Sequence, residues 1–304
     1  MKSVEEIKRL ASKVPFFVNP SVSFLSEGYG NYNYLVQDEG RKYVLRIKKS
    51  KETQFKDSLE KEYSFLKYFE SQGIKFCPKV FFYDDVDNFL IEEFLEGKEV
   101  SQKDFTKSQI DLFARQLHAL FRLDVKKFSS FCSENGYKKF GYVNPVDNLK
   151  KYGFGRFEEA KKSGLNDAYC YWIESRLNKN LCYLEAQEED GEVGFAWGDI
   201  QSRVIITDDG VMLFYDFEHA VITKSFGLAY IKIHGKFSDQ QFDCLVERCA
   251  FRFNRTINEL LDEIETEERI IRTNDVVWAA MKWAKTKDEK FKNLMLERIK
   301  LVED

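Results

Sequence analysis

The stretch that decides the fold is FAWGDIQSRVIITDDGVMLFYDFEHA, residues 195–220. Two mainly apolar runs, 195–207 and 211–217, are typical of strands, and an Asp-Asp-Gly sequence at 208–210 joins them. A short turn of this composition between apolar runs is a strong signal for a β-hairpin. The sequence therefore predicts an antiparallel strand pair in this part of the chain.

Three acidic residues lie on or beside the predicted strands: Asp199, Asp216 and Glu218. Asp216 and Glu218 alternate on one face of a strand end, and the apolar residues around them disfavour simple solvent exposure. Neighbouring carboxylates are costly unless a cation, such as a metal ion, neutralises them. Phosphoryl transfer needs this chemistry, since one carboxylate orients or deprotonates a hydroxyl group and another holds Mg²⁺ at the phosphates. The alternative is a pair of acidic surface turns.

The first third of the chain predicts a small β-rich unit. Strand-like segments at 24–36 and 42–48 are joined by a polar turn that contains glycine. A helix follows at 56–73, with apolar residues at helical spacing and a terminal glycine, and then come two short strands at 79–83 and 88–93.

The remainder of the chain predicts mostly helices. Amphipathic helical patterns cover 108–123, 168–188 and 238–304. Strands at one end and helices at the other predict an α+β fold. We expect two lobes: residues 1–96, with a five-stranded sheet and one helix, and residues 97–304, mainly helical, with the catalytic and metal loops and the acceptor pocket.

The phosphate-binding candidates lie in the first predicted lobe. Gly28, Gly30 and Asn31 form a turn whose backbone can approach a phosphate closely, although two glycines in a hairpin are also typical of a simple turn. Arg46 lies between apolar neighbours in a predicted inner strand, so its side chain should face an anion. Glu62 lies in the following helix, and kinases hold the α- and β-phosphates with such a strand cation and helix glutamate. The alternative is a surface arginine and a solvated glutamate.

A further candidate is the segment NFLIEEFLEG, residues 88–97, at the boundary between the predicted lobes. It runs from an apolar strand into Glu93 and Leu95, where the backbone can pair with the edge of an adenine ring while an apolar side chain packs on the ring. The pattern by itself is not specific for nucleotides.

The sequence resembles the superfamily of aminoglycoside phosphotransferases and choline/ethanolamine kinases, whose members have a protein-kinase-like fold of two lobes. The similarity extends through nearly the whole chain in the family's order. The segments that carry it are GYGNYNYLV (28–36), YVLRI (43–47), KEYSFLKYF (61–69), FARQLHALFRL (113–123), WGDIQSRVII (197–206), FYDFEHA (214–220) and VVWAAMKWAKTKDEKFKNLMLERI (276–299).

The resemblance implies a phosphotransferase that uses ATP or GTP with Mg²⁺ and phosphorylates a hydroxyl group of a small molecule. Asp199 matches the family's catalytic aspartate. Asp216 and Glu218 match its metal-binding acidic residues, while Arg46 and Glu62 match its phosphate-binding pair. The acceptor remains open between choline, ethanolamine, a sugar, an aminoglycoside and a nucleoside-like alcohol.

Two residues depart from the family pattern. Trp197 stands at the position of the loop histidine, and Val204 stands at the position of a metal-binding asparagine. Valine cannot ligate a metal ion. Either Asp216 and Glu218 hold the metal alone, or residues 201–203 rearrange to help, or the chain is an inactive relative that binds nucleotide or acts as a scaffold.

Two tryptophans, Trp278 and Trp283, are candidates for an aromatic box around an ammonium group of the acceptor. The alternative is that both rings serve only in packing.

Composition and charge indicate which partners and which compartment to expect. The net charge is -4 and neither half of the chain is markedly basic, which disfavours a dedicated nucleic-acid binder. Six cysteines without a CxxC pair suit a reducing cytoplasm. The amphipathic N-terminus is unlike a signal peptide, and no apolar run reaches the roughly 20 residues of a membrane helix. We therefore expect a cytoplasmic protein that does not bind membranes, with its oligomeric state open.

Overall fold

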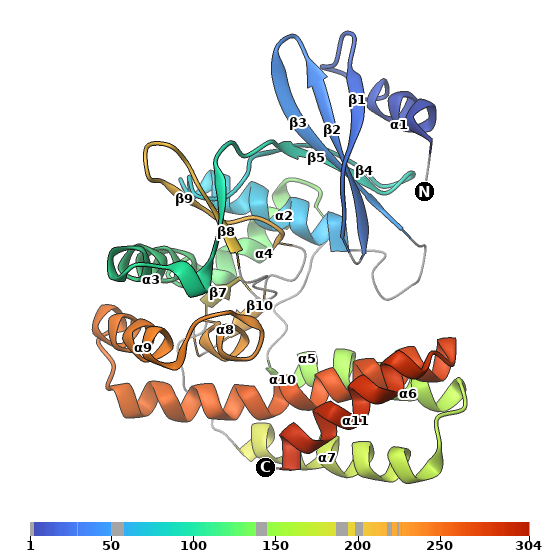
Figure 1. Cartoon of the computed structure of the whole chain (residues 1–304), viewed down its shortest axis with the longest axis vertical. Coiled ribbons are helices and arrows are strands. Elements are labelled where there is room, and N and C mark those ends of the chain that lie inside the picture. Colours follow the sequence, from blue (N-terminus) through green and yellow to red (C-terminus); the bar gives the residue numbers. More distant parts are fainter. Residues whose placement is uncertain are drawn as a thin grey trace.

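Strands and helices separate into two lobes, with the larger sheet at the top of Figure 1 and most helices below it. The predicted α+β organisation is confirmed. The structure is a computed structural model, and it describes residues 3–28, 30–49, 58–137, 145–186, 194–197, 203–217, 221–223, 225 and 227–303.

The N-terminal lobe contains an antiparallel sheet of five strands in the order β1-β2-β3-β5-β4. Its strands are β1 (Ser21–Glu27), β2 (Asn31–Asp38), β3 (Arg41–Lys48), β4 (Val80–Asp84) and β5 (Phe89–Glu93). The sheet has the five expected strands, but the segment predicted at 24–36 is not one strand: β1 ends at Glu27 and β2 begins at Asn31.

The two faces of this sheet have different partners. Leu45 and Ile47 of β3 are buried on the outer face, where α1 (Val4–Ala11) packs its residues Ile7 and Leu10. Arg46 lies between these two strand residues and therefore points to the inner face, toward the helical lobe.

The prediction of a single helix within residues 1–96 is wrong, because α1 is a second one. Ser3 and Glu6 form a capping box that satisfies the first backbone donors of α1. The helix is only eight residues long, so its stability depends on packing against the sheet rather than on its own hydrogen bonds.

The predicted helix at 56–73 is α2 (Ser58–Ser71), which lies beneath the inner face of the sheet. Leu59, Leu66 and Phe69 form its apolar stripe and are buried in the main core. Glu62 lies on the same stripe and is also fully buried, so the fold places a carboxylate inside the apolar contact.

The hairpin predicted at 208–210 is present, but the strands around it are shorter than expected. β8 (Arg203–Ile206) and β9 (Met212–Leu213) pair across the turn, and β6 (Lys98–Ser101) pairs with the other edge of β8. The predicted strand over 195–207 is wrong as one element. Its first part is β7 (Gly194–Ala196), which pairs with β10 (Val221–Thr223) instead.

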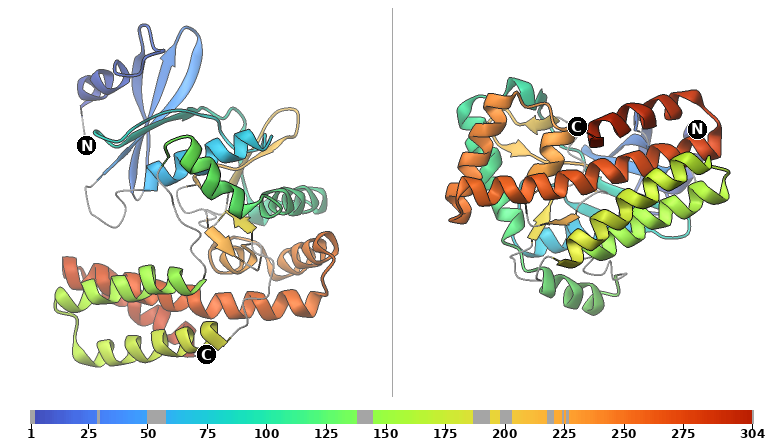
Figure 2. Two further views of the ribbon diagram at one scale, coloured as in Figure 1. Left: turned by 180° about the vertical axis from the view of Figure 1, so that it is seen from behind. Right: turned by 90° about the horizontal axis from the view of Figure 1, so that it is seen from below.

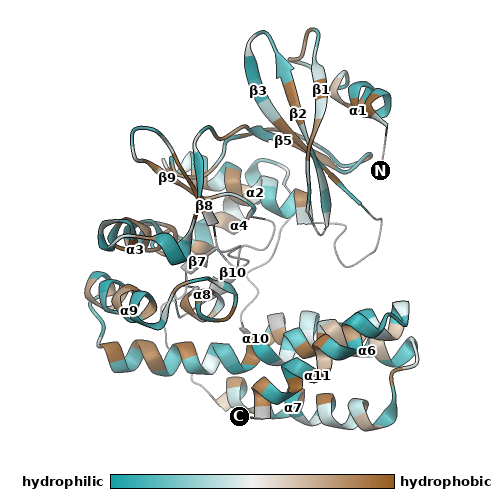
Figure 3. Ribbon diagram, in the orientation of Figure 1, coloured by the Kyte–Doolittle hydropathy of each residue, from teal (hydrophilic) through white to brown (hydrophobic). Residues whose placement is uncertain are grey.

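Helices make up the rest of the C-terminal lobe, and α7 and α10 lie side by side when the molecule is seen from below (Figure 2). In Figure 3, apolar and polar residues alternate along α10, as expected for a helix with a buried side. The elements are a 3₁₀ turn (Gln102–Asp104), α3 (Lys107–Phe121), α4 (Val125–Glu134), α5 (Pro145–Asn148), a π-helical stretch (Leu149–Phe154), α6 (Gly155–Lys162), α7 (Asp167–Ala186), α8 (Leu228–His234), α9 (Asp239–Phe253), α10 (Ile257–Thr286) and α11 (Glu289–Glu303).

Candidate active site

The structure brings three of the predicted residues into one cluster where the two lobes meet. Arg46 of β3 donates from Nη1 to Oε1 of Glu62 over 2.7 Å and from Nη2 to Oδ1 of Asp216 over 2.6 Å. The side chains of Arg46 and Glu62 are 6% and 0% exposed, and that of Asp216 is 19% exposed. The pair is therefore buried, and Asp216 lies at its partly open side.

Glu62 also connects α2 to the segment that follows β9. Its Oε1 accepts a second hydrogen bond, 2.7 Å long, from the backbone N–H of Phe217. The carboxylate therefore fixes both the guanidinium of Arg46 and the backbone next to Asp216. A buried carboxylate is stable only with such charged or hydrogen-bonding partners.

Asp216 has an unusual backbone conformation, with φ at +65°. A residue other than glycine rarely adopts this left-handed region unless the surrounding contacts hold it there. Trp197 supplies one such contact by donating from Nε1 to the backbone oxygen of Asp216 over 3.3 Å.

Trp197 stands where the family pattern has a histidine, and its side chain is only 1% exposed. Its ring stacks on Phe214, with centroids 4.5 Å apart and an angle of 13° between the planes, and it lies 6.1 Å from the ring of Phe217. The tryptophan thus holds the segment that carries Asp216 through ring stacking and one hydrogen bond.

Sequence reasoning missed one member of the cluster, Glu92 of β5. Its Oε1 lies 3.7 Å from Nη1 of Arg46, and its side chain is 9% exposed. Val44, two residues before Arg46, is the cross-strand partner of Glu92, so Glu92 and Arg46 share the inner face. The alternation of side chains along 88–97 places Glu92 and Glu93 on opposite faces of a strand. Which of the two faces Arg46 is known only from the register between β3 and β5.

The neighbouring residue Glu93, predicted to contact the nucleotide, lies in a different environment. Its carboxylate accepts a hydrogen bond from the backbone N–H of Lys79, and its own N–H donates to the oxygen of Lys79. Leu95, also predicted to contact the nucleotide, is half-buried just beyond the strand. The nucleotide roles of Glu93 and Leu95 stay predictions.

The predicted phosphate loop is the connection between β1 and β2. The N–H of Gly28 donates to the oxygen of Asn31 over 3.0 Å, and the oxygen of Gly30 accepts from the N–H of Lys49. Asn31 is 3% exposed. Its position lies opposite Lys48 on β3, two residues beyond Arg46, so the loop is next to the cluster.

Several predicted residues lie outside the part of the chain that the structure describes. They are Asp199, Gln201, Ser202, Glu218 and the side chain of Arg203. Val204, at the position of the family's metal-binding asparagine, is fully buried in β8 and pairs with Val100. Within the described ranges, no group of three or more His, Cys, Asp or Glu side chains is arranged to hold a metal ion.

The two candidate acceptor residues have different neighbours. The ring of Trp278 contacts Phe291 and has the guanidinium of Arg298 at 5.5 Å. The ring of Trp283 has the ammonium of Lys292 at 5.3 Å. Side-chain cations of this protein thus already lie over both rings, and the acceptor role stays a prediction.

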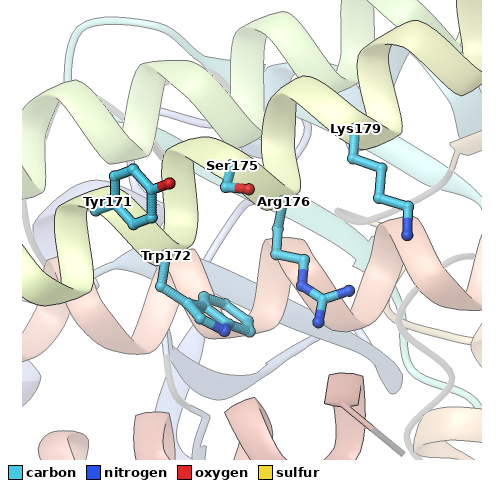
Figure 4. Close-up of a pocket in the computed structure, with 5 residues that line it drawn as sticks. All are labelled: Tyr171, Trp172, Ser175, Arg176 and Lys179. Carbon is cyan, nitrogen blue, oxygen red and sulfur yellow. The ribbon is translucent and has the colours of Figure 1, made fainter.

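A hollow of about 400 Å³ lies elsewhere, on α7 (Figure 4). It is lined by Tyr171, Trp172, Ser175, Arg176 and Lys179. All five residues come from one helix, and that helix lies at the end of the molecule away from the sheet in Figure 1. The hollow is therefore separate from the Arg46 cluster.

Comparison with known proteins supports the assignment of the fold. The model of the phosphotransferase enzyme family (APH) matches residues 21–223, which extend from the start of β1 to the end of β10. A search of curated proteins finds no match.

Several solved structures are similar to this chain over nearly its whole length. Choline kinase LicA from Streptococcus pneumoniae is 16% identical, with a TM-score of 0.68 and 98% of each chain covered. Ethanolamine kinase Pv091845 from Plasmodium vivax is 17% identical, with a TM-score of 0.65 and 93% of this chain and 81% of that chain covered. APH(2")-IIa in complex with gentamicin is 12% identical, with a TM-score of 0.72 and coverage of 100% and 97%. These likenesses confirm the predicted protein-kinase-like fold.

Proposed function

Because this chain belongs to the phosphotransferase enzyme family, we propose that it transfers the γ-phosphoryl group of ATP or GTP to a hydroxyl group of a small molecule. The observation that carries the proposal is the buried ion pair of Arg46 and Glu62, which is bonded to Asp216 across the lobe boundary. A cation held in this way is suited to gripping the phosphates of a nucleotide.

The donor chemistry of the cluster fits Mg²⁺. This ion needs only one or two protein carboxylates, because water molecules and phosphate oxygens complete its coordination. Asp216 offers one partly exposed carboxylate, and we propose Glu218, outside the described residues, as its companion. When bound, Mg²⁺ neutralises charge that develops on the phosphates during transfer.

The side chains of this protein would act in three ways. Arg46 donates from its Nη2 edge to a phosphate oxygen, and Glu62 keeps the guanidinium and the backbone of Phe217 in place. Asp199, outside the described residues, would orient the acceptor hydroxyl and accept its proton while the oxygen bonds to the γ-phosphorus. The bond from that phosphorus to the β–γ bridging oxygen breaks at the same time, and ADP or GDP leaves. Turnover should therefore fall by orders of magnitude when Asp199 is replaced by asparagine.

The choice of nucleotide and acceptor is suggested only by the relatives. LicA has been solved with AMP, and APH(2")-IIia with GDP and kanamycin. We propose that the loop of Gly28, Gly30 and Asn31 covers the phosphates, and that Glu93 and Leu95 border the base. Trp278 and Trp283 stay candidates for the acceptor side.

We also propose that the protein works in the cytoplasm with nucleotide and small-molecule partners only. Its cysteines are all free thiols, as a reducing compartment favours. Among the described residues, no helix has the length and apolar character needed to cross a bilayer.

A second candidate function is a pseudokinase that binds nucleotide or a protein partner without catalysis. Two observations favour it: Val204 is buried where the family has a metal ligand, and Trp197 fills the position of the loop histidine. Val204 has no polar side-chain atom, and the N–H of the Trp197 side chain is used for the bond to the backbone of Asp216.

A thermal-shift titration distinguishes the two functions. An active phosphotransferase should be stabilised by ATP or GTP in a Mg²⁺-dependent way and should consume the nucleotide when an acceptor is supplied. Stabilisation that does not depend on Mg²⁺, without consumption across an acceptor panel, would favour the pseudokinase. No response to any nucleotide would contradict the phosphotransferase and the nucleotide-binding pseudokinase, and would leave only a pseudokinase that binds a protein partner.

A further inference from the structure

Arg46 is surrounded by more carboxylates than a simple ion pair needs. Oxygens of Glu62, Glu92 and Asp216 lie 2.7, 3.7 and 2.6 Å from its terminal nitrogens. These three acids and one base carry a formal charge of −2 when all are ionised. The excess is unusual beside a site proposed to bind phosphates, since like charges oppose each other.

The geometry divides the acids into two groups. Glu62 and Glu92 approach Nη1 of Arg46 from α2 and from β5, whereas Asp216 approaches Nη2. The side chains of Glu62 and Glu92 are 0% and 9% exposed, so water cannot easily replace either contact. Nη1 of the guanidinium is thus hydrogen-bonded to α2 and within ion-pair distance of β5, and Nη2 faces the partly exposed Asp216.

This arrangement suits arginine better than lysine. A guanidinium is planar and offers several donors in a fixed fork, whereas an ammonium is a compact point charge. One ammonium cannot reach toward Glu62, Glu92 and Asp216 in the same directions. Glu92 therefore gives a physical reason for Arg46 in this strand.

We propose that Glu92 is a positioning residue of the phosphate site: it fixes the plane of the Arg46 guanidinium so that the Nη2 edge points at the phosphates. The role rests on the proposed nucleotide-dependent function. It predicts that Glu92 acts on the phosphate part of a nucleotide and not on the base.

The test compares the affinities of ATP and adenosine in wild type and in Glu92→Gln, by calorimetric titration with Mg²⁺ present. Glutamine keeps the shape of the side chain but loses its charge. We expect ATP to bind about fivefold to tenfold more weakly and adenosine to bind unchanged. Glu70→Gln is the matched control, because Glu70 forms an exposed ion pair with Lys67, and both ligands should bind as in wild type.

If Glu92 acted only through its charge, its replacement would change the affinity for ATP in the opposite direction. If Glu92 only adds negative charge near the phosphates, Glu92→Gln binds ATP more tightly, which would overturn the proposal. Equal loss of ATP and adenosine would also overturn it, because that pattern indicates a general structural defect. Glu92→Met leaves no buried polar group, and it replaces the glutamine variant if circular dichroism shows that variant to be unfolded.

Arg46→Lys allows a second, independent test that needs no ligand. In urea unfolding, Arg46→Lys should be much more destabilising in wild type than in the Glu92→Gln background, because lysine removes the guanidinium nitrogen that lies 3.7 Å from Glu92. If the two substitutions changed the free energy of unfolding additively, Glu92 and Arg46 would not be coupled, and the proposal would be overturned. Absence of binding of both ATP and GTP by wild type would contradict the proposed function, while the unfolding measurement would still decide whether Glu92 orients Arg46.

Discussion

Replacing Glu62 by glutamine tests the buried ion pair of the N-terminal lobe to which Asp216 and Phe217 of the other lobe are bonded. The carboxylate is fully buried and accepts bonds from Arg46 and from the N–H of Phe217, both at 2.7 Å. Glutamine can still accept from Phe217, so the main loss is the charge that faces Arg46. Breaking a buried pair costs about 3–5 kcal/mol. Because Glu92 and Asp216 still face the guanidinium, we expect about 2–3 kcal/mol, near the range for one hydrogen bond to a charged group.

Urea unfolding followed by circular dichroism measures this loss, with Glu70→Gln on the same helix as the control. Glu70 is 42% exposed in its pair with Lys67, so its replacement should change the free energy of unfolding by less than about 0.5 kcal/mol. The Glu62 variant should also bind ATP more weakly, since Arg46 is then no longer held in place. A Glu62→Gln protein as stable as the control would refute the idea that this carboxylate holds the site together.

Two further predictions concern stability. Gly194→Ala should destabilise the fold by about 3 kcal/mol, because its new Cβ would lie 2.1 Å from the backbone oxygen of the last residue of α3. Gly155→Ala is the control: the nearest contact of its Cβ would be at 3.9 Å, so it should be nearly neutral in the same unfolding assay. Burial would raise the pKa of Glu268, but hydrogen bonds from Lys232 and Arg272 outweigh it and hold the pKa below its ordinary 4.5. The stability advantage of wild type over Glu268→Gln should therefore be constant well above pH 4.5 and shrink as the pH falls through the lowered pKa; an advantage that grows on acidification would contradict this.

The parts of the site that depend on local pattern could be predicted from the sequence. The turn at 208–210 follows from its Asp-Asp-Gly composition, and the inward direction of Arg46 follows from the alternation of side chains in a strand. Glu62 could be identified because it lies in the helix that follows the strand of Arg46, in the order that kinases use, and because its segment resembles the family helix.

The parts that depend on pairing between distant segments could not. Choosing Glu92 rather than Glu93 as the partner of Arg46 requires the register between β3 and β5. The division of 195–207 into β7 and β8 follows from their pairing with β10 and β6, and neither partner is adjacent in the chain. The contact of Trp197 with the segment of Asp216 likewise depends on its stacking against Phe214, which lies in a different strand region of the chain.

The central claim is that this chain transfers phosphate from a nucleotide to a hydroxyl group through the cluster of Arg46, Glu62 and Asp216. The most direct measurement is ³¹P nuclear magnetic resonance of wild type and Asp216→Asn, with ATP or GTP, Mg²⁺ and a panel of small alcohols. The account predicts a phosphate monoester of one acceptor with wild type, and a loss of at least about a hundredfold in its rate with the folded variant. Transfer by Asp216→Asn at the wild-type rate would contradict the account.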